Sequence, residues 1–174
     1  TADKKGLLEA ANGGTLFLDD VSALSPKNQE ILLRFMQDQS FYRQGGNIHL
    51  HSDVRLIAAS SRDLESLMQQ KLFREDLFYR LNIVQISLPD LAQRKSDILL
   101  LAEHFISQVN LKYGTHVVRL STPAIDMLMS YHWPGNVQEL ENCIERAALA
   151  TSDDCIHSHN LPPTLQTDES ARKP

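Results

Sequence analysis

The chain has 174 residues, which is enough for one domain or for a domain with a small companion. Hydrophobic residues make up 42% and charged residues 22%, so the sequence supports a real core with the charge content of an ordinary globular protein. The formal net charge of −5, without any Lys/Arg run, argues against a segment that grips DNA, and no apolar stretch approaches the roughly 18 residues of a membrane span.

The first elements predicted along the chain are a short helix and a buried strand. Residues 1–5 lack signal-peptide character, and strand-forming sequence follows almost at once, so we expect the chain to be cut from a longer protein. A helix is predicted over residues 7–11 and ends at an Asn-Gly-Gly sequence. Residues 15–18 are apolar without alternation, which is typical of a strand buried on both faces of a parallel sheet flanked by helices.

Helices and further strands are predicted up to residue 92. Ser25 and Pro26 mark a helix start, because a capping residue precedes proline at the first helical position. A hairpin is predicted from two apolar segments that flank the turn-like residues 44–47. The remaining predicted elements are a buried strand over residues 54–59, short helices over 64–70 and 75–81, and a third strand over 83–88, closed by Pro89.

From about residue 94 the pattern becomes helical throughout. Apolar residues at helical spacing predict three helices, and Asn136 and Glu139 have the spacing of a capping box at the start of the third. We therefore expect an α/β part over residues 1–92 and a helical part over 93–162. The polar residues 163–174 are expected to form a linker.

Two acidic residues follow the first predicted strand. In open α/β sheets, ligands bind beyond the carboxyl ends of the strands, where Asp19 and Asp20 would lie. Two acids there can orient a hydrated magnesium ion and polarise an attacking water. Alternatively, the pair simply ends a strand in a turn. These residues alone do not decide between the two interpretations.

Four segments carry motifs that are specific in combination: EAANGGTLFLDD at residues 9–20, VRLIAA at 54–59, FREDLFYRLN at 73–82 and WPGNVQELEN at 133–142. In that order, they resemble the Walker B region, the strand leading to sensor I, the arginine-finger segment and the lid helix with sensor II of sigma-54-dependent bacterial transcriptional activators. The resemblance covers about residues 6–162. It implies an α/β fold class, with a partial AAA+ P-loop-type parallel sheet and flanking helices, followed by an all-helical lid subdomain.

The resemblance also implies an ATPase that forms a ring of six or seven subunits, uses ATP and Mg²⁺ and acts on RNA polymerase carrying sigma-54. Cys143 and Cys155 give no ligand pattern and no disulfide framework, so we expect a reduced, cytoplasmic protein. Hydrolysis sites in such rings lie between subunits, and turnover remodels a polymerase stalled at a closed promoter. In this chain, Asp19 would orient magnesium through water and Asp20 would activate the lytic water. Ser61, Arg94 and Gln138 hold the positions that would contact the nucleotide.

Arg74 and Arg80 are the candidates for the arginine finger. An arginine placed against a neighbour's γ-phosphate stabilises transition-state charge, which can be worth about 10³–10⁵ in rate. Six residues at 3.6 per turn would put the two side chains about 240° apart on one regular helix. Asp76 lies four residues before Arg80, in position for an ordinary ion pair within the helix. Either arginine therefore remains a candidate.

Four positions depart from the pattern of the activators. Asp20 stands in place of the usual Glu and is one methylene shorter, and Ser61 stands in place of the sensor I Asn. Gln138 replaces the sensor II Arg and cannot offer a charged fork to phosphate, and Ala92 replaces another Arg, while Arg94 is retained. We therefore expect hydrolysis by the parent protein to be slow or lost, with nucleotide binding retained.

Two elements of such activators do not occur in residues 1–174. These are the Gly-x-x-x-x-Gly-Lys-[Ser/Thr] loop that cradles phosphates and the Gly-Ala-Phe-Thr-Gly-Ala loop that touches sigma-54. In the family, both lie upstream of the position of Gly6. On its own, the chain is expected to bind ATP weakly or not at all, which leaves its status as an enzyme open.

Three functional interpretations remain open. The first is a fragment of an enhancer-binding activator, with a sensor domain before it and a helix-turn-helix DNA-binding domain after it. The second is a ligand-gated oligomerisation module of a regulator that no longer acts on sigma-54. An AAA+ chelatase or loader is a poorer match, because the segments that start at Phe73 and Trp133 fit the activators more closely.

The remaining candidate groups favour structural roles. His49 and His51, like His157 and His159, lie two residues apart, as metal ligands can, but exposed surface positions explain both pairs better. Trp133 is predicted to anchor the core of the helical part. The only two cysteines, Cys143 and Cys155, form no disulfide framework, and Cys143 is predicted to be packed beside a buried helical face.

Overall fold

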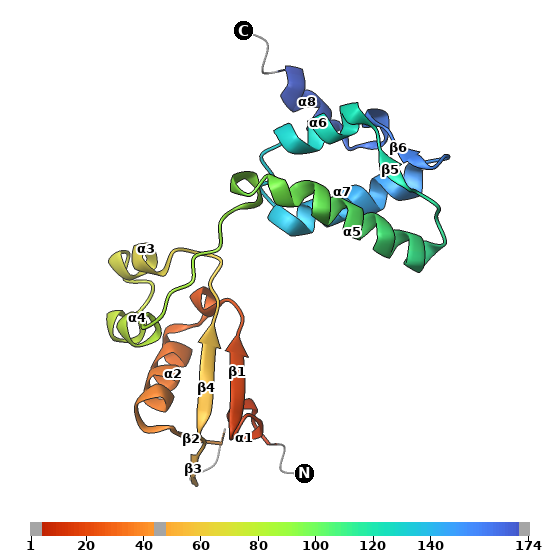
Figure 1. Cartoon of the computed structure of the whole chain (residues 1–174). Helices are drawn as coiled ribbons and strands as arrows, with labels where there is room; N and C mark the ends of the chain where they lie inside the picture. The colour runs from red at the N-terminus through yellow and green to blue at the C-terminus, as the bar shows by residue number, and fades with distance from the viewer. Residues whose placement is uncertain (1–4, 44–47, 171–174) are drawn as a thin grey trace. The chain divides into compact units, whose positions relative to one another are not determined.

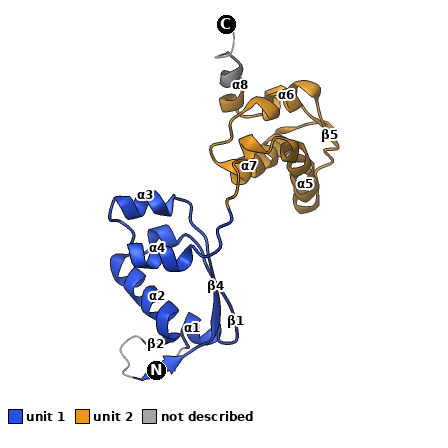
Figure 2. Cartoon of the chain, turned by 60° about the vertical axis from the view of Figure 1, so that its left-hand side comes forward, with its two compact units in different colours: residues 1–86 blue, residues 87–174 orange. Residues whose placement is uncertain are grey.

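The computed structural model describes residues 5–43 and 48–170 (Figure 1). The chain divides into two compact units, residues 1–86 and 87–174, each with its own secondary structure and core (Figure 2). Within the described residues, none of the helices has the length and apolar character needed to cross a membrane.

The first unit is built on two parallel strands, β1 (Gly14–Leu18) and β4 (Val54–Ala58). They pair in register from Gly14 opposite Val54 to Leu18 opposite Ala58, and they run side by side in Figure 1. Backbone hydrogen bonds from Ala59 N to Leu18 O and from Val21 N to Ala59 O, each 2.9 Å, continue the pairing beyond the strands. The segments that follow the two strands are therefore held together at one edge.

Helix α2 (Pro26–Asp38) covers one face of this strand pair. Ser25 caps it by accepting a hydrogen bond from Asn28 N, and Pro26 occupies its first turn, as the sequence predicts. A buried cluster forms where α2 meets the two helices that follow β4, and it consists of Leu32, Leu33, Leu67, Phe73 and Leu77. Leu18 and Leu56 of the strands pack against this cluster. The other elements of the unit are α1 (Leu7–Ala10), η1 (Val21–Ala23), β2 (Ser40–Tyr42), β3 (His49–His51), α3 (Leu64–Gln69) and α4 (Glu75–Leu81).

Of three expectations for the strands of this unit, two are wrong and one is confirmed. Burial of the strands on both faces is wrong for this chain, because Phe17 and Ile57, on the face opposite α2, are 58% and 45% exposed. The third strand over residues 83–88 is also wrong, since its four large apolar side chains are between 79% and 86% exposed. A strand needs a hydrogen-bonding neighbour, and β1 and β4 pair only with each other in the described part of the chain. The hairpin is present as the antiparallel pair β2–β3, but its predicted turn, residues 44–47, lies outside the described residues.

The second unit is a group of helices around a single apolar core. Its elements are η2 (Leu91–Gln93), α5 (Ser96–Tyr113), β5 (Arg119–Leu120), α6 (Thr122–Ser130), α7 (Asn136–Ala150), β6 (Cys155–Ile156), η3 (Ser158–Asn160) and α8 (Pro163–Ser170). The predicted apolar stripes face inward, and the residues that are fully buried include Ile98, Ala102, Ala124, Leu128, Leu140, Ile144 and Ala147. The parallel pair β5–β6 is a small addition that the sequence did not predict.

Trp133 anchors this core, as predicted. It is 1% exposed, and its indole N–H donates to Leu128 O at 2.9 Å. The ring of Tyr131 meets it edge-on, with the ring centroids 5.1 Å apart. Because the indole is both packed and hydrogen-bonded, Trp133 fixes the turn between α6 and α7.

The predicted capping box is wrong in its first member. The N-cap of α7 is Gly135, whose backbone N–H donates to Glu139 Oε2 at 2.8 Å, so Glu139 acts as expected. Asn136 is instead the first residue of the helix and has a positive φ of 49°. Its side chain accepts a hydrogen bond of 2.8 Å from Leu91 N, which joins η2 to the start of α7.

The expected linker is helical over most of its length. Helix α8 spans Pro163–Ser170, and Leu165 is 3% exposed and belongs to the core of the unit. The polar composition of this segment predicted a linker, but burial of the single side chain of Leu165 is enough to pack a short helix against the core. Residues 171–174 lie outside the described part of the chain.

Candidate functional site

The acidic residues predicted to carry chemistry lie at the carboxyl ends of the two parallel strands. Asp19 directly follows β1 and is exposed. Asp20 adopts a left-handed conformation, with φ 51° and ψ 66°, as it leads into η1. Ser60 and Ser61 follow β4 at the same edge and are exposed. The structure therefore brings together the two strand ends that the sequence placed at one site.

Hydrogen bonds hold the carboxylate of Asp20 at this edge. Ser22 donates its hydroxyl to Asp20 Oδ1, and Ser61 N lies 3.5 Å from the same oxygen. The hydroxyl of Ser22, followed by the backbone N–H of Ser61, lowers the pKa of Asp20 below its usual value. Asp20 is therefore ionised at neutral pH, as an acceptor of protons from water must be.

Ser22 is a site residue that the sequence analysis missed. It lies two residues after Asp20, and its hydroxyl is the main support of that carboxylate. The signal was an Asp-x-Ser sequence directly after a predicted strand, because short polar side chains commonly bond across such turns.

Arg74 lies at the N-cap position of α4, with φ −72° and ψ 134°, outside the regular helix. Its guanidinium forms a two-point ion pair with Asp76, with Nε to Oδ1 at 3.0 Å and Nη2 to Oδ2 at 2.7 Å. The expected pair between Asp76 and Arg80 is therefore wrong, because the extended backbone at Arg74 brings that guanidinium to Asp76 first.

Arg80, in the last turn of α4, is held differently. Its Nε and Nη2 both donate to the carbonyl oxygen of Met36 on α2, at 3.2 Å and 2.9 Å. A neutral carbonyl competes less strongly for a guanidinium than a carboxylate does. The two candidate arginines thus have different partners, and each is exposed to solvent.

A buried glutamine of α2 supports the beginning of α4. Gln29 is 1% exposed, and its side chain makes hydrogen bonds to the backbone of Leu24, Leu72 and Arg74. The sequence analysis missed it. The signal was its spacing, because Gln29 lies three and four residues before the buried Leu32 and Leu33 and so belongs to the apolar stripe of the helix.

The remaining candidate contacts to nucleotide belong to the second unit. Gln138 is exposed on α7, and its amide donates to Glu141 Oε2 at 3.2 Å. Arg94 faces Asp97 at 3.5 Å, while its shielded Nε has no hydrogen-bond partner among the described residues. Whether Arg94 and Gln138 approach the strand ends of the first unit stays a prediction.

The strand-end residues fit one half of a nucleotide site. Ionised and exposed oxygens suit Mg²⁺, which prefers oxygen ligands and keeps several waters. Asp19 offers an exposed carboxylate for this purpose, and Asp20 a carboxylate whose Oδ1 is already oriented by Ser22. The half that would hold phosphates is a Gly-Lys-[Ser/Thr] loop, which residues 1–174 do not contain.

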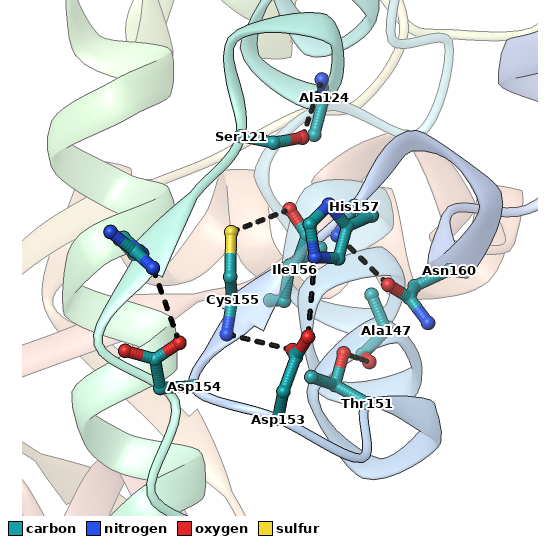
Figure 3. A network of polar contacts seen from close by, with 11 residues as sticks. Ser121, Ala124, Ala147, Thr151, Asp153, Asp154, Cys155, Ile156, His157 and Asn160 are labelled. Carbon is teal, nitrogen blue, oxygen red and sulfur yellow. Dashed lines mark hydrogen bonds and ion pairs between the residues drawn. The ribbon is translucent and has the colours of Figure 1, made fainter.

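A second polar cluster lies in the loop after α7 (Figure 3). Asp153 accepts from Cys155 N at 3.0 Å and faces His157 Nε2 at 3.3 Å, and His157 N donates to Asn160 at 2.8 Å. The amide of Cys155, together with His157, lowers the pKa of Asp153. All of these bonds join residues two to four positions apart around β6, so the cluster stabilises the loop and needs no ligand to explain it.

The histidine pairs also have structural partners. The rings of His157 and His159 stack with an interplanar angle of 6° and centroids 5.4 Å apart. In the hairpin, His51 Nδ1 lies 2.5 Å from Gln39 O. Within the residues that the structure describes, no group of three or more His, Cys, Asp or Glu side chains is arranged to hold a metal ion.

Comparisons with known proteins agree for both units. Residues 1–87 match the family model of the sigma-54 interaction domain, and residues 92–174 match that of the AAA+ ATPase lid domain. The chain is 53% identical to the nitrogen fixation protein AnfA of Azotobacter vinelandii, over 96% of this chain and 31% of that protein. It is 41% identical to the regulatory protein AtoC of Escherichia coli (strain K12), over 94% of this chain and 35% of that protein.

A solved structure supports the same relationship. The crystal structure of NtrX from Brucella abortus in complex with ATP matches with a TM-score of 0.90 and 36% identity. The match covers 97% of this chain and 39% of that one. The chain thus spans about a third of the length of the relatives that it matches.

Proposed function

Because the chain belongs to the family of sigma-54 interaction domains followed by an AAA+ lid, we propose that it is the nucleotide-sensing part of a bacterial transcription regulator. That regulator couples ATP binding and hydrolysis in a ring of subunits to activation of RNA polymerase carrying sigma-54. The observation that carries the proposal is the meeting of Asp20 and Ser61 at the ends of two parallel strands. Such a meeting point is where an open α/β sheet binds its ligand.

In the proposed site, Asp19 holds magnesium through water and Asp20 accepts a proton from the attacking water. Mg²⁺ would neutralise charge that develops on the phosphates. Because Ser22 and Ser61 already occupy Oδ1 with hydrogen bonds, Oδ2 of Asp20 is the oxygen that would act as the base. Ser61, Arg94 and Gln138 are the proposed contacts to the nucleotide. One relative, NtrX from Brucella abortus, was crystallised with ADP and with ATP, which supports a nucleotide as the ligand of the proposed site.

Arg74 or Arg80 would act on the nucleotide of a neighbouring subunit. To bind a phosphate, Arg74 would have to give up its ion pair with Asp76, whereas Arg80 would have to give up only its hydrogen bonds to the carbonyl oxygen of Met36. Both exchanges replace a partner on the same chain by a more highly charged one, which is favourable for a guanidinium. Residues 1–92 would form the sheet part and 93–162 the lid, and the parent protein would bind DNA through a helix-turn-helix domain after residue 174.

We expect slow hydrolysis, because four positions depart from the pattern of active relatives. The test uses the complete AAA+ domain, expressed from its own gene with the residues that precede this chain. ATP binding measured by calorimetry should be retained, while turnover should be low. The combined substitutions Asp20→Glu, Ser61→Asn and Gln138→Arg should raise turnover by about tenfold or more. Failure of the complete domain to bind ATP would overturn the proposal, and fast turnover in the unchanged domain would overturn the expectation of slow hydrolysis.

The second candidate function is a nucleotide- or ligand-gated oligomerisation module that no longer acts on sigma-54. The neutral Gln138 and the serine at residue 61 favour it, because both weaken contacts needed for turnover more than contacts needed for binding. A pull-down with purified sigma-54 in the presence of an ATP analogue separates the two. Nucleotide-dependent rings that retain sigma-54 support the first function, and rings that do not retain it support the second.

A further inference from the structure

A single buried amide joins three backbone segments around the beginning of α4. Gln29 Nε2 donates to Leu24 O at 3.0 Å and to Leu72 O at 3.1 Å, and its Oε1 accepts from Arg74 N at 2.9 Å. Both N–H groups and the carbonyl oxygen of the amide are therefore satisfied. Burying an amide without such partners would cost roughly 1–3 kcal/mol on the scale of protein substitutions.

The three segments differ in their relation to the proposed site. Leu24 ends the turn that begins at Asp20, at the carboxyl end of β1. Leu72 and Arg74 lie on either side of the buried Phe73, directly before α4. Gln29 thus links the strand end that carries the proposed water-activating carboxylate to the helix that carries both candidate arginines.

The helix α2 holds α4 at both of its ends. At the beginning, Gln29 accepts from the backbone N–H of Arg74. At the end, the carbonyl oxygen of Met36 accepts from the guanidinium of Arg80. The backbone at Arg74 determines where its guanidinium can reach, because the residue lies at the N-cap and not inside the helix.

We propose that Gln29 is a positioning residue for hydrolysis, which holds the backbone of Arg74 so that its guanidinium reaches the phosphate of a neighbouring subunit. This inference rests on the proposed function and adds a residue to its machinery. Gln29 is buried and its amide is taken up by backbone groups, so it would act through Arg74. A displacement of about 1 Å in a group of this kind can cost up to about a hundredfold in rate.

The test is a double-mutant cycle in the complete AAA+ domain, with hydrolysis of radiolabelled ATP as the readout so that slow turnover can be measured. Gln29→Met keeps the length of the side chain but removes all three hydrogen bonds. We expect kcat to fall by about tenfold or more, with KM for ATP changed less than about twofold, because the finger acts in the transition state and not in binding. Gln37→Ala, at an exposed position on the same helix, is the matched control and should change neither.

The decisive comparison is with Arg74→Ala. If Gln29 acts through Arg74, then Gln29→Met should change kcat less than about twofold when Arg74 is already absent. A merely structural glutamine would lower kcat by the same factor in both backgrounds, and this result would overturn the inference while leaving the proposed function intact. Should Gln29→Met fail to fold, Gln29→Asn serves instead, because it keeps an amide but is one methylene too short to reach all three partners, and the same comparison with and without Arg74 applies.

Two outcomes separate failure of the inference about Gln29 from failure of the proposed finger residue. If Arg74→Ala leaves kcat unchanged, the assignment of Arg74 fails, and the inference about Gln29 fails with it. If the unchanged domain binds ATP but Gln29→Met and Arg74→Ala lower kcat additively, only the inference about Gln29 fails. Thermal unfolding of every variant shows which losses of kcat accompany a loss of stability.

Discussion

Short polar side chains tune the strand-end site through hydrogen bonds to one carboxylate. Asp20 is partly exposed at the strand ends, and the hydroxyl of Ser22 is the main cause of its lowered pKa, which partial burial opposes. A lowered pKa keeps the carboxylate ionised but makes it a weaker base. The site therefore favours an oriented carboxylate over a strongly basic one, which agrees with the expectation of slow hydrolysis.

Replacing Ser22 by alanine should raise the pKa of Asp20 towards its ordinary value of about 3.9. The reason is the loss of the largest of the hydrogen bonds that stabilise the ionised form. The ionised form of a carboxyl with a lowered pKa stabilises the fold above its unfolded pKa, and this stabilisation is lost as pH falls through the folded value. Ser22→Ala should therefore also weaken the loss of stability below about pH 4.

The measurement for Ser22→Ala is a carbon-13 NMR titration of the Asp20 carboxyl group in this chain. Ser107→Ala is a suitable control, because Ser107 donates to Glu103 O on α5 in the other unit. An unchanged pKa of Asp20 in Ser22→Ala would contradict the assignment.

Burial controls the reactivity of the two thiols. Burial, aided by the nearby carboxylate of Glu139, raises the pKa of Cys143 to about 12, and Cys143 and Cys155 are 4% and 6% exposed. At pH 8 both thiols should resist a thiol-reactive reagent such as Ellman's, because access to each is blocked and, for Cys143, thiolate is also scarce. Two thiols should react quickly after unfolding in urea, and an added Ser107→Cys should react at once in the native protein. Fast reaction of a native thiol in the unchanged chain would contradict the buried placement.

At the scale of elements, the helices were the part of the fold most readily predicted from sequence. Helix starts such as Ser25-Pro26 depend on local chemistry, and α2, α4 and α7 begin within one or two residues of their predicted positions. Strands depend on partners that a local pattern cannot reveal. Residues 83–88 have the composition of a strand, yet no described neighbour pairs with them. Gln29 and Ser22 were missed for the same reason, because their roles depend on hydrogen bonds to particular backbone or carboxylate groups that a local pattern does not reveal.

The start of α7 gives a test at this scale. Asn136 has a φ of 49° and accepts from the buried Leu91 N–H, so alanine there combines backbone strain with an orphaned donor. Asn136→Ala should destabilise the second unit by about 2–4 kcal/mol. Asn136→Asp keeps an acceptor and tolerates the left-handed region, so it should lose about 1 kcal/mol or less.

Urea denaturation followed by Trp133 fluorescence measures both variants. Asn142→Ala, at an exposed position of the same helix, provides the control. Equal stability of Asn136→Ala and this control would show that the bond to Leu91 contributes nothing.

At the scale of the whole molecule, the chain contains two separate cores. The core of the first unit is drawn from residues 32–77, and the core of the second from residues 91–165. The first unit also leaves Phe17 and Ile57 exposed on the sheet face opposite α2. Less apolar burial per residue makes it the less stable unit by the area argument.

Unfolding of the whole chain should therefore occur in two steps. Trp133 is the only tryptophan and is buried in the second core, so its fluorescence reports that unit alone, while far-UV circular dichroism reports both. Leu77 is fully buried in the first core, and Leu77→Ala should destabilise that unit by about 2–5 kcal/mol. The early circular dichroism transition should move to lower urea, while the fluorescence midpoint stays in place. Ile144→Ala, its counterpart in the second core, should move the fluorescence midpoint instead. Coincident transitions for both probes in every variant would mean that the two cores unfold as one cooperative unit, and the division of the chain into independent halves would then be wrong.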